Sequence, residues 1–133
     1  NITIKWGKCN YKYYKIVMRI FNIFQSKDSL KRKIRVIEKE IKKLVSIVCN
    51  ENFSVLQYGA YEINPKHLVF WICVDTDKMK EKLMDNESLK NKLNELLVIH
   101  KYPKDAINYV FIGFESQETV DRESKGDWFL HFK

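Results

Sequence analysis

A regular stripe of apolar residues predicts a long helix between residues 28 and 49. The stripe repeats at spacings of three and four, which matches the helical period, at Leu30, Ile34, Ile37, Ile41, Leu44 and Val48. Ser26 or Asp28 can begin this helix, because a short polar side chain accepts a free backbone N–H of the first turn. We therefore expect an amphipathic helix that lies on a sheet.

Two apolar runs after this helix predict a pair of β-strands. Residues 53–63 alternate loosely around Gly59, and residues 68–75 are apolar at almost every position. The tripeptide 64–66, Asn-Pro-Lys, is typical of a turn between them. A strand that is apolar on both faces needs a layer on each side of the sheet. We expect an aromatic N-terminal segment to supply the second layer, with Tyr11, Tyr13, Tyr14, Phe21 and Phe24.

A second helical region follows and is interrupted. Residues 78–100 have helical periodicity, but Met79 and Leu83 do not share the phase of the later leucines. We expect a break near residues 85–88, which are polar. The helix should end before Pro103, because the proline ring blocks its continuation.

The last third of the chain predicts two more strands. Residues 108–114 and 127–132 are apolar runs of strand length. The polar and acidic residues 115–126 connect them and have room for a helical turn begun by Ser116. Nothing in the pattern requires a parallel crossover, so these strands are expected to form a second hairpin.

The order of the elements is therefore α-β-β-α-β-β. It predicts an α+β fold with an antiparallel four-stranded sheet, helices packed on it, and the N-terminal aromatic segment in addition. A chain of 133 residues has the usual size of one domain, so we expect a single domain over residues 1–133. Residues 1–17 are interpreted as a peripheral arm or an upstream extension, because Met18 opens a stretch that reads like a natural protein start.

Charge is distributed unevenly along the chain. Residues 1–49 hold 13 Lys and Arg against 3 Asp and Glu, a net of +10, and residues 50–133 hold 11 against 14, a net of −3; the two sum to the +7 of the whole chain. Such asymmetry is typical of a protein whose face or arm meets a polyanion or an acidic partner. The abundance of lysine, isoleucine and asparagine is typical of an AT-rich genome and indicates a bacterial source.

The composition also indicates in which cellular compartment the protein works. Cys9, Cys49 and Cys73 are odd in number and widely spaced, which fits neither a disulfide framework nor a zinc site. No apolar run approaches the ~18 residues of a membrane span. These features predict a cytoplasmic protein that does not bind a membrane.

Motifs of catalysis are sparse. The chain has no G-x-S-x-G or G-x-x-x-x-G-K-[ST] sequence, and its three histidines share no spacing with cysteine or carboxylate. We therefore expect a protein that is not an enzyme and that needs no cofactor or metal. A minor alternative is a metal-dependent nuclease that uses Asp75, Asp77 and Glu115, because carboxylates at strand ends are typical Mg²⁺ ligands.

The C-terminal region predicts a protein-binding function. Acidic residues gather there next to a tryptophan, at Glu115, Glu118, Asp121, Glu123, Asp127 and Trp128. An acidic rim around an aromatic anchor suits a basic partner. The leading hypothesis is a small non-enzymatic binding module, most concretely an inhibitor or immunity-type protein that occludes a basic partner such as a toxin nuclease.

The basic helix 28–49 supports the alternative hypothesis of a nucleic-acid-binding protein. Lysine and arginine side chains along one side of a helix neutralise phosphates. The residues expected to do so are Lys31, Arg32, Arg35, Lys39 and Lys42.

Overall fold

The computed structural model describes residues 29–133. The chain groups into two units, Asn1–Arg32 and Lys33–Lys133. Residues 29–48 are helical, and the rest of the description concerns the second unit by itself. The expectations for residues 1–17 and for the N-terminal aromatic segment lie outside the described residues.

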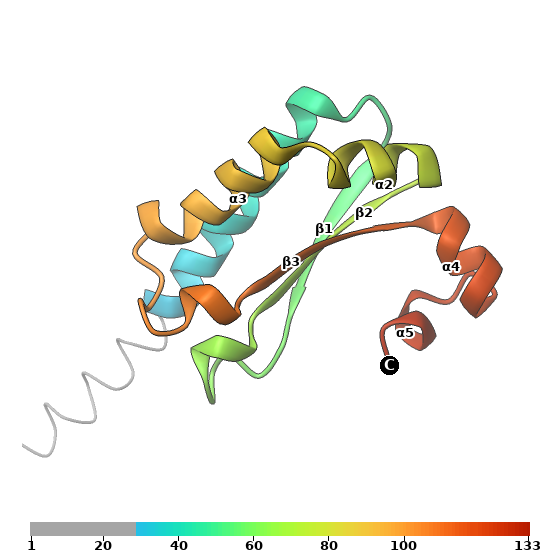
Figure 1. Ribbon diagram of the computed structural model, residues 1–133. Helices are drawn as coiled ribbons and strands as arrows, with labels where there is room; N and C mark the ends of the chain where they lie inside the picture. Colours follow the sequence, from blue (N-terminus) through green and yellow to red (C-terminus); the bar gives the residue numbers. More distant parts are fainter. Residues whose placement is uncertain (1–28) are drawn as a thin grey trace, which may run out of the picture. The chain divides into compact units, whose positions relative to one another are not determined.

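A three-stranded mixed sheet is the centre of the second unit (Figure 1). Its strands are β1 (Phe53–Tyr58), β2 (Val69–Val74) and β3 (Phe111–Ser116), in the order β1-β2-β3. β1 is antiparallel to β2, and β2 is parallel to β3. In this register Val55 lies beside Ile72, and Ile72 lies beside Phe114, so one face of the sheet is apolar across all three strands.

Helices α2 (Asp77–Met84) and α3 (Glu87–Ile99) connect β2 to β3. Thr76 begins α2 by accepting the N–H of Met79, and Asn86 begins α3 by accepting the N–H of Leu89. The remaining elements are the short 3₁₀ helices η1 (Pro65–His67) and η2 (Ile107–Tyr109) and the C-terminal helices α4 (Gln117–Ser124) and α5 (Trp128–His131).

The core lies between the sheet and two helices. Residues 33–48 of the long helix and α3 lie on the same side of the strands (Figure 1). Side chains of β2 that point to this side, Phe70, Ile72 and Val74, are almost completely buried. The helices contribute Ile34, Ile37, Ile41, Val45, Leu89, Leu93 and Leu97 to the same core. Burying each such side chain contributes about 1.5–3 kcal/mol, so this face supplies most of the stability.

The expected four-stranded antiparallel sheet is wrong. The described sheet has three strands, and one of its two pairings is parallel. The expected strand 127–132 is instead occupied by α5 (Trp128–His131), because the Asp127 carboxylate accepts the N–H of Leu130 and begins a helical turn. Trp128 and Phe132 are then one turn apart and both reach the sheet.

The parallel pairing also has a physical cause. α2 and α3 together supply the long crossover that brings β3 back in the same direction as β2. The run of apolar residues in β2 fits a central strand, which is covered on both faces, but it does not fix the direction of β3.

Several local predictions are confirmed. The long helix spans residues 29–48, the second helical region breaks between Met84 and Glu87, and Ser116 begins α4 by accepting the N–H of Thr119. Within residues 29–133, none of the helices has the length and apolar character that crossing a membrane requires.

Candidate functional site

The face of the sheet opposite the core is aromatic. Tyr58, Trp71 and Phe111 come from the three strands, and Trp71 Nε1 donates a hydrogen bond of 2.8 Å to the Tyr58 hydroxyl. The rings of Trp71 and Phe111 meet edge to face, with centroids 5.1 Å apart. Gly113 makes this possible, because a Cβ there would lie 2.5 Å from the Phe111 ring and 2.8 Å from the Trp71 ring.

Helix α5 covers part of this aromatic face. Phe132 stacks on Trp71 with centroids 4.8 Å apart, and Trp128 lies 5.6 Å from Phe132. α5 and β1 leave a hollow of about 380 Å³ between them, lined by Leu56, Tyr58, Trp128, Phe129, Phe132 and Lys133. We call this hollow the aromatic groove. Beside it, Phe129 is 76% exposed and Leu130 is 52% exposed, so α5 presents large apolar side chains to solvent.

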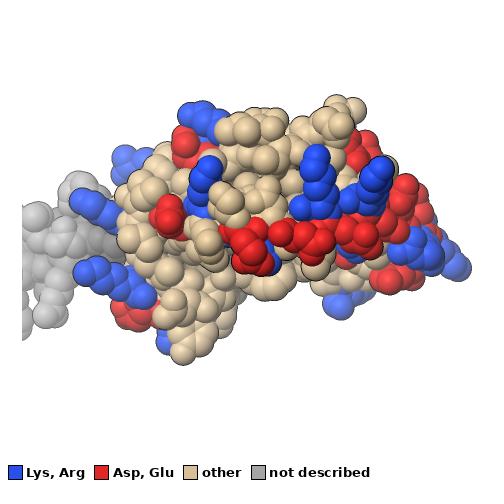
Figure 2. Space-filling view, turned by 45° about the horizontal axis from the view of Figure 1, so that its top comes forward, with Lys and Arg blue, Asp and Glu red and all other residues tan. Residues whose placement is uncertain are grey.

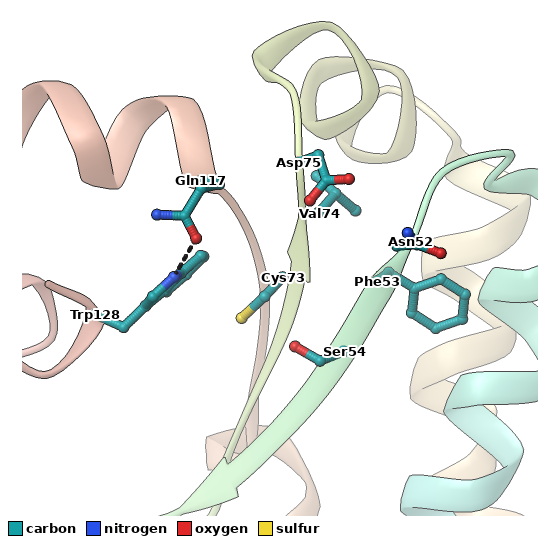
Figure 3. A pocket seen from close by; sticks show the side chains of 8 residues that line it. All are labelled: Asn52, Phe53, Ser54, Cys73, Val74, Asp75, Gln117 and Trp128. Atoms are coloured by element: carbon teal, nitrogen blue, oxygen red, sulfur yellow. Dashed lines mark hydrogen bonds between the residues drawn. The ribbon is translucent and has the colours of Figure 1, made fainter. Parts of the chain in front are cut away.

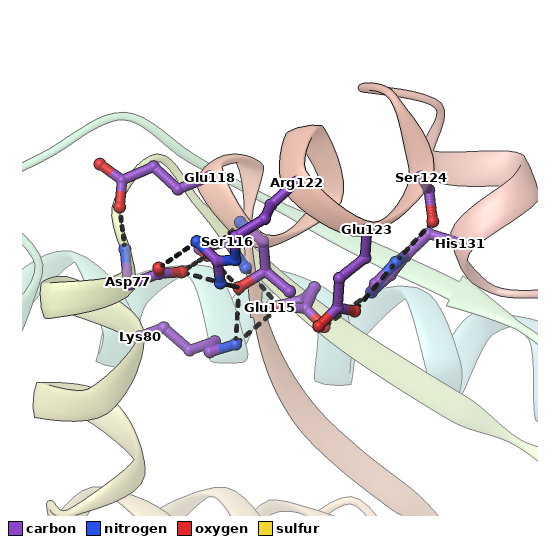
Figure 4. Close-up of polar contacts among 10 residues, drawn as sticks. Asp77, Lys80, Glu115, Ser116, Glu118, Arg122, Glu123, Ser124 and His131 are labelled. Carbon is purple, nitrogen blue, oxygen red and sulfur yellow. Dashed lines mark hydrogen bonds and ion pairs between the residues drawn. The ribbon is translucent and has the colours of Figure 1, made fainter.

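A chain of buried and half-buried polar side chains holds α5 against the sheet (Figure 4). His131 Nε2 lies 2.9 Å from Glu115 Oε2, and Lys80 Nζ lies 2.9 Å from Glu115 Oε1. On the other side of the imidazole ring, His131 Nδ1 lies 3.0 Å from the Ser124 hydroxyl oxygen. Burial opposes ionisation of Glu115, but hydrogen bonds from Lys80, His131 and the Ser116 N–H outweigh it and lower the pKa of Glu115.

The Ser124, His131 and Glu115 side chains have the hydrogen-bond order of a nucleophile, a base and an orienting acid. A reaction would also need room for a substrate and donors for an oxyanion. Ser124 is buried and does not line the aromatic groove, and the nearby N–H groups of Gly126 and Asp127 are bonded to the carbonyls of Val120 and Ser124. The arrangement therefore fits a structural role. We call these side chains, Lys80, Glu115, Ser124 and His131, the tether, because they link α4, α5 and β3.

A second polar cluster joins the starts of α2 and α4. The Asp77 carboxylate accepts hydrogen bonds from the Ser116 and Thr119 hydroxyls and from Arg122 Nη1, the last at 2.9 Å. These hydrogen bonds, of which the one from Ser116 has the largest effect, hold the pKa of Asp77 well below its usual range. The Glu118 carboxylate accepts the Asp77 N–H at 2.9 Å, so the two helix starts are bonded to each other.

We predict that the folded state loses stability as the pH falls below about 4. Asp77 and Glu115 both have lowered pKa values in the folded chain, against about 3.9 and about 4.3 in an unfolded one. Their contribution is complete above the unfolded pKa values and is lost as the pH falls through the folded ones. Urea midpoints from tryptophan fluorescence between pH 7 and pH 2 measure this, and Asp77→Asn should give a flatter dependence. A dependence in Asp77→Asn equal to that of the wild type would contradict the prediction.

The structure separates the acidic residues expected to bind a partner. Glu115 is buried in the tether, whereas Glu118, Asp121, Glu123 and Asp127 are exposed on α4 and just after it. Figure 2 shows acidic side chains gathered toward the end of the molecule where α2 and α4 lie, with basic side chains among them. Trp128 is half-buried, and its Nε1 donates to Gln117 Oε1 at 2.7 Å.

Other members of the site were missed from the sequence. Phe129, Phe132 and Leu56 line the aromatic groove, and Lys80 and His131 hold α5 in place. The four-residue spacing of Trp128 and Phe132 was the available signal, since it fits one side of a helix as well as one face of a strand.

The carboxylates of the alternative metal site do not converge. Asp77 pairs with Arg122, Glu115 pairs with Lys80 and His131, and Asp75 lines a separate hollow. In the part of the chain that the structure describes, no three side chains of the metal-ligating types are grouped to hold an ion.

The basic residues of helix 29–48 are mostly on its surface. Arg32, Arg35, Lys39 and Lys42 are exposed and Lys31 is half-buried. Lys42 forms an ion pair of 3.0 Å with Glu38. This acidic neighbour reduces the positive charge that the helix offers to a polyanion.

Comparison of the chain with protein-family models, with curated proteins and with solved structures finds no significant match.

Proposed function

We propose that this protein is a protein-binding module whose contact surface is the aromatic groove together with the exposed side of α5. The observation that carries the proposal is Phe129, which is 76% exposed beside a groove lined by four other apolar or aromatic side chains. Exposed clusters of large apolar side chains are typical of interaction sites, and aromatic residues dominate their binding energy.

The charge next to this surface favours a basic partner. Glu118, Asp121 and Glu123 are exposed on α4, and Asp121 is linked to the groove through Gln117, whose amide bonds to both Asp121 and Trp128. An apolar centre with an acidic rim attracts a basic protein and orients it as it docks. In its most concrete form the protein inhibits a toxin nuclease by occluding its basic substrate-binding face.

Affinity capture tests the proposal. The full chain is immobilised and exposed to lysate of the source organism, with and without prior treatment with DNase and RNase. We expect one discrete protein to be retained in both cases, and its retention to fall in a Phe129→Ser variant. Recovery of nucleic acid alone, lost after nuclease treatment and at high salt, would contradict the proposal and would support the basic helix as the functional surface.

Reversal of the acidic charges should slow association with the captured partner. We expect the double variant Asp121→Lys and Glu123→Lys to lower the association rate constant by about tenfold at low salt, because steering depends on these charges. Surface plasmon resonance at two salt concentrations measures the effect. The double variant Glu81→Lys and Glu95→Lys carries the same charge change on α2 and α3, where both side chains are exposed, and serves as the control. Equal slowing in both variants would show that only the overall charge matters.

A further inference from the structure

A second hollow, of about 280 Å³, shares Trp128 with the aromatic groove as a lining residue (Figure 3). It is formed between the ends of β1 and β2 and the two C-terminal helices, and is lined by Asn52, Phe53, Ser54, Cys73, Val74, Asp75, Gln117 and Trp128. Trp128 and Gln117 form one wall, and Cys73 and Ser54 lie across from them. We call it the Asp75 pocket.

The polar groups of this pocket favour a cation. Among the described residues, neither lysine nor arginine lines it. Within residues 29–133, the Asp75 carboxylate and the Asn52 side-chain amide form no hydrogen bond or ion pair, whereas the carboxylates of Asp77 and Glu115 are fully engaged. An exposed carboxylate without a partner at the edge of a concave site attracts positive charge.

The same pocket offers little to an anion. The backbone N–H groups of Asp75 and Thr76, which come just before α2, both donate to Glu51 Oε2 at 3.1 Å. Glu51 therefore satisfies the donors that could otherwise bind a phosphate at this helix start and adds a second negative charge nearby.

One wall of the pocket is a fixed indole ring. Trp128 Nε1 donates to Gln117 Oε1 at 2.7 Å, and Gln117 Nε2 donates in turn to Asp121 Oδ1 at 2.8 Å. A tryptophan ring is the best aromatic partner for an ammonium or guanidinium group. Opposite it, burial raises the pKa of Cys73 to about 11, so the thiol is neutral at pH 7 and does not act as a nucleophile there.

We propose that the Asp75 pocket binds one arginine or lysine side chain of the partner protein. The proposal rests on the proposed function, because it names the site that recognises a basic side chain of the partner protein. Its volume of about 280 Å³ lies at the low end of the range for ligand sites, about 300–1,000 Å³, and is large enough for a single side chain. Trp128 lines both the aromatic groove and the Asp75 pocket, so the groove would take an apolar side chain and the pocket a basic side chain next to the same ring.

The pocket can be tested without the partner. N-acetyl-arginine amide is titrated into the full chain labelled with ¹⁵N, and the indole N–H of Trp128 and the side-chain amide of Asn52 are followed by NMR. We expect both signals to shift with a Kd of about 1 mM, and Asp75→Asn to weaken binding at least tenfold. N-acetyl-citrulline amide has the same shape without the charge and should not bind. Asp105→Asn removes another exposed carboxylate, in the segment before η2, and should bind the arginine probe as the wild type does.

The outcomes separate this proposal from the proposed function. Binding of the arginine probe that Asp75→Asn abolishes supports the pocket, even if no protein is captured from lysate. Equal shifts with the citrulline probe, or binding that Asp75→Asn leaves unchanged, would overturn it. Capture of a partner whose affinity does not change in Asp75→Asn would also overturn it, while leaving the protein-binding function in place.

Discussion

Replacement of Glu115 by alanine is expected to lower the free energy of unfolding by about 3 kcal/mol and to release α5 from the sheet. Glu115 is only 9% exposed to solvent, and its carboxylate binds both Lys80 and His131. Its removal leaves both groups without their acceptor in a partly buried site, and Lys80, with 20% of its side-chain surface exposed, recovers some hydration. The estimate is therefore at the lower end of the range for broken buried pairs.

Urea denaturation followed by tryptophan fluorescence measures this loss, and hydrogen exchange of residues 128–132 measures the release of α5. Glu87→Ala is the matched control, because Glu87 pairs with Lys90 at 2.7 Å while its side chain is 75% exposed. Exposed pairs of this kind contribute about 0.2–1 kcal/mol. Similar losses in both variants would show that the tether does not hold α5.

Replacement of Gly59 by alanine is expected to cost about 3 kcal/mol or more. Gly59 follows β1 with φ of +112°, and a Cβ there would lie 1.8 Å from the carbonyl oxygen of His67. The obstacle is backbone that leads into β2, so the end of the hairpin must move. Tyr58, the residue before Gly59, lines the aromatic groove, so the site should be disturbed together with the stability.

Gly126→Ala is the comparison for this second variant. Gly126 also has a positive φ, of +82°, but its added Cβ would meet only the Asp121 side chain, at 3.1 Å. We expect a loss of about 1 kcal/mol there, from backbone strain alone. Thermal unfolding of the two variants measures the difference. Equal losses would mean that the close approach of His67 to Gly59 is not a constraint on the fold.

The core could be predicted from the sequence because its signals are local. The helix over residues 29–48 and the strand β2 follow from apolar periodicity, and the breaks at Asn86 and Ser116 follow from capping side chains. The direction of β3 could not be predicted in the same way, because pairing between β2 and β3 depends on how a crossover of two helices closes. That is a property of the whole chain.

Residues near the C-terminus show the limit of prediction from the sequence most clearly. Residues 127–132 have the composition of a strand, and their tertiary environment decides otherwise. Asp127 begins a helical turn, Phe132 finds Trp71 to stack on, and His131 finds Glu115. None of these three contacts is visible in a local pattern. The acidic residues were predicted as a group, but burial assigns Glu115 to structure and leaves Asp121 and Glu123 at the surface.

The most direct test of the protein-binding function is the affinity of the captured partner for two matched variants. Phe129 and Ile47 are similarly exposed, at 76% and 79%, but Phe129 lines the aromatic groove and Ile47 lies on helix 29–48. Isothermal titration calorimetry should show a Kd about 30-fold higher for Phe129→Ser, equivalent to about 2 kcal/mol, and an unchanged Kd for Ile47→Ser. An unchanged Kd for Phe129→Ser would contradict the account, and a loss confined to Ile47→Ser would move the binding surface to the basic helix.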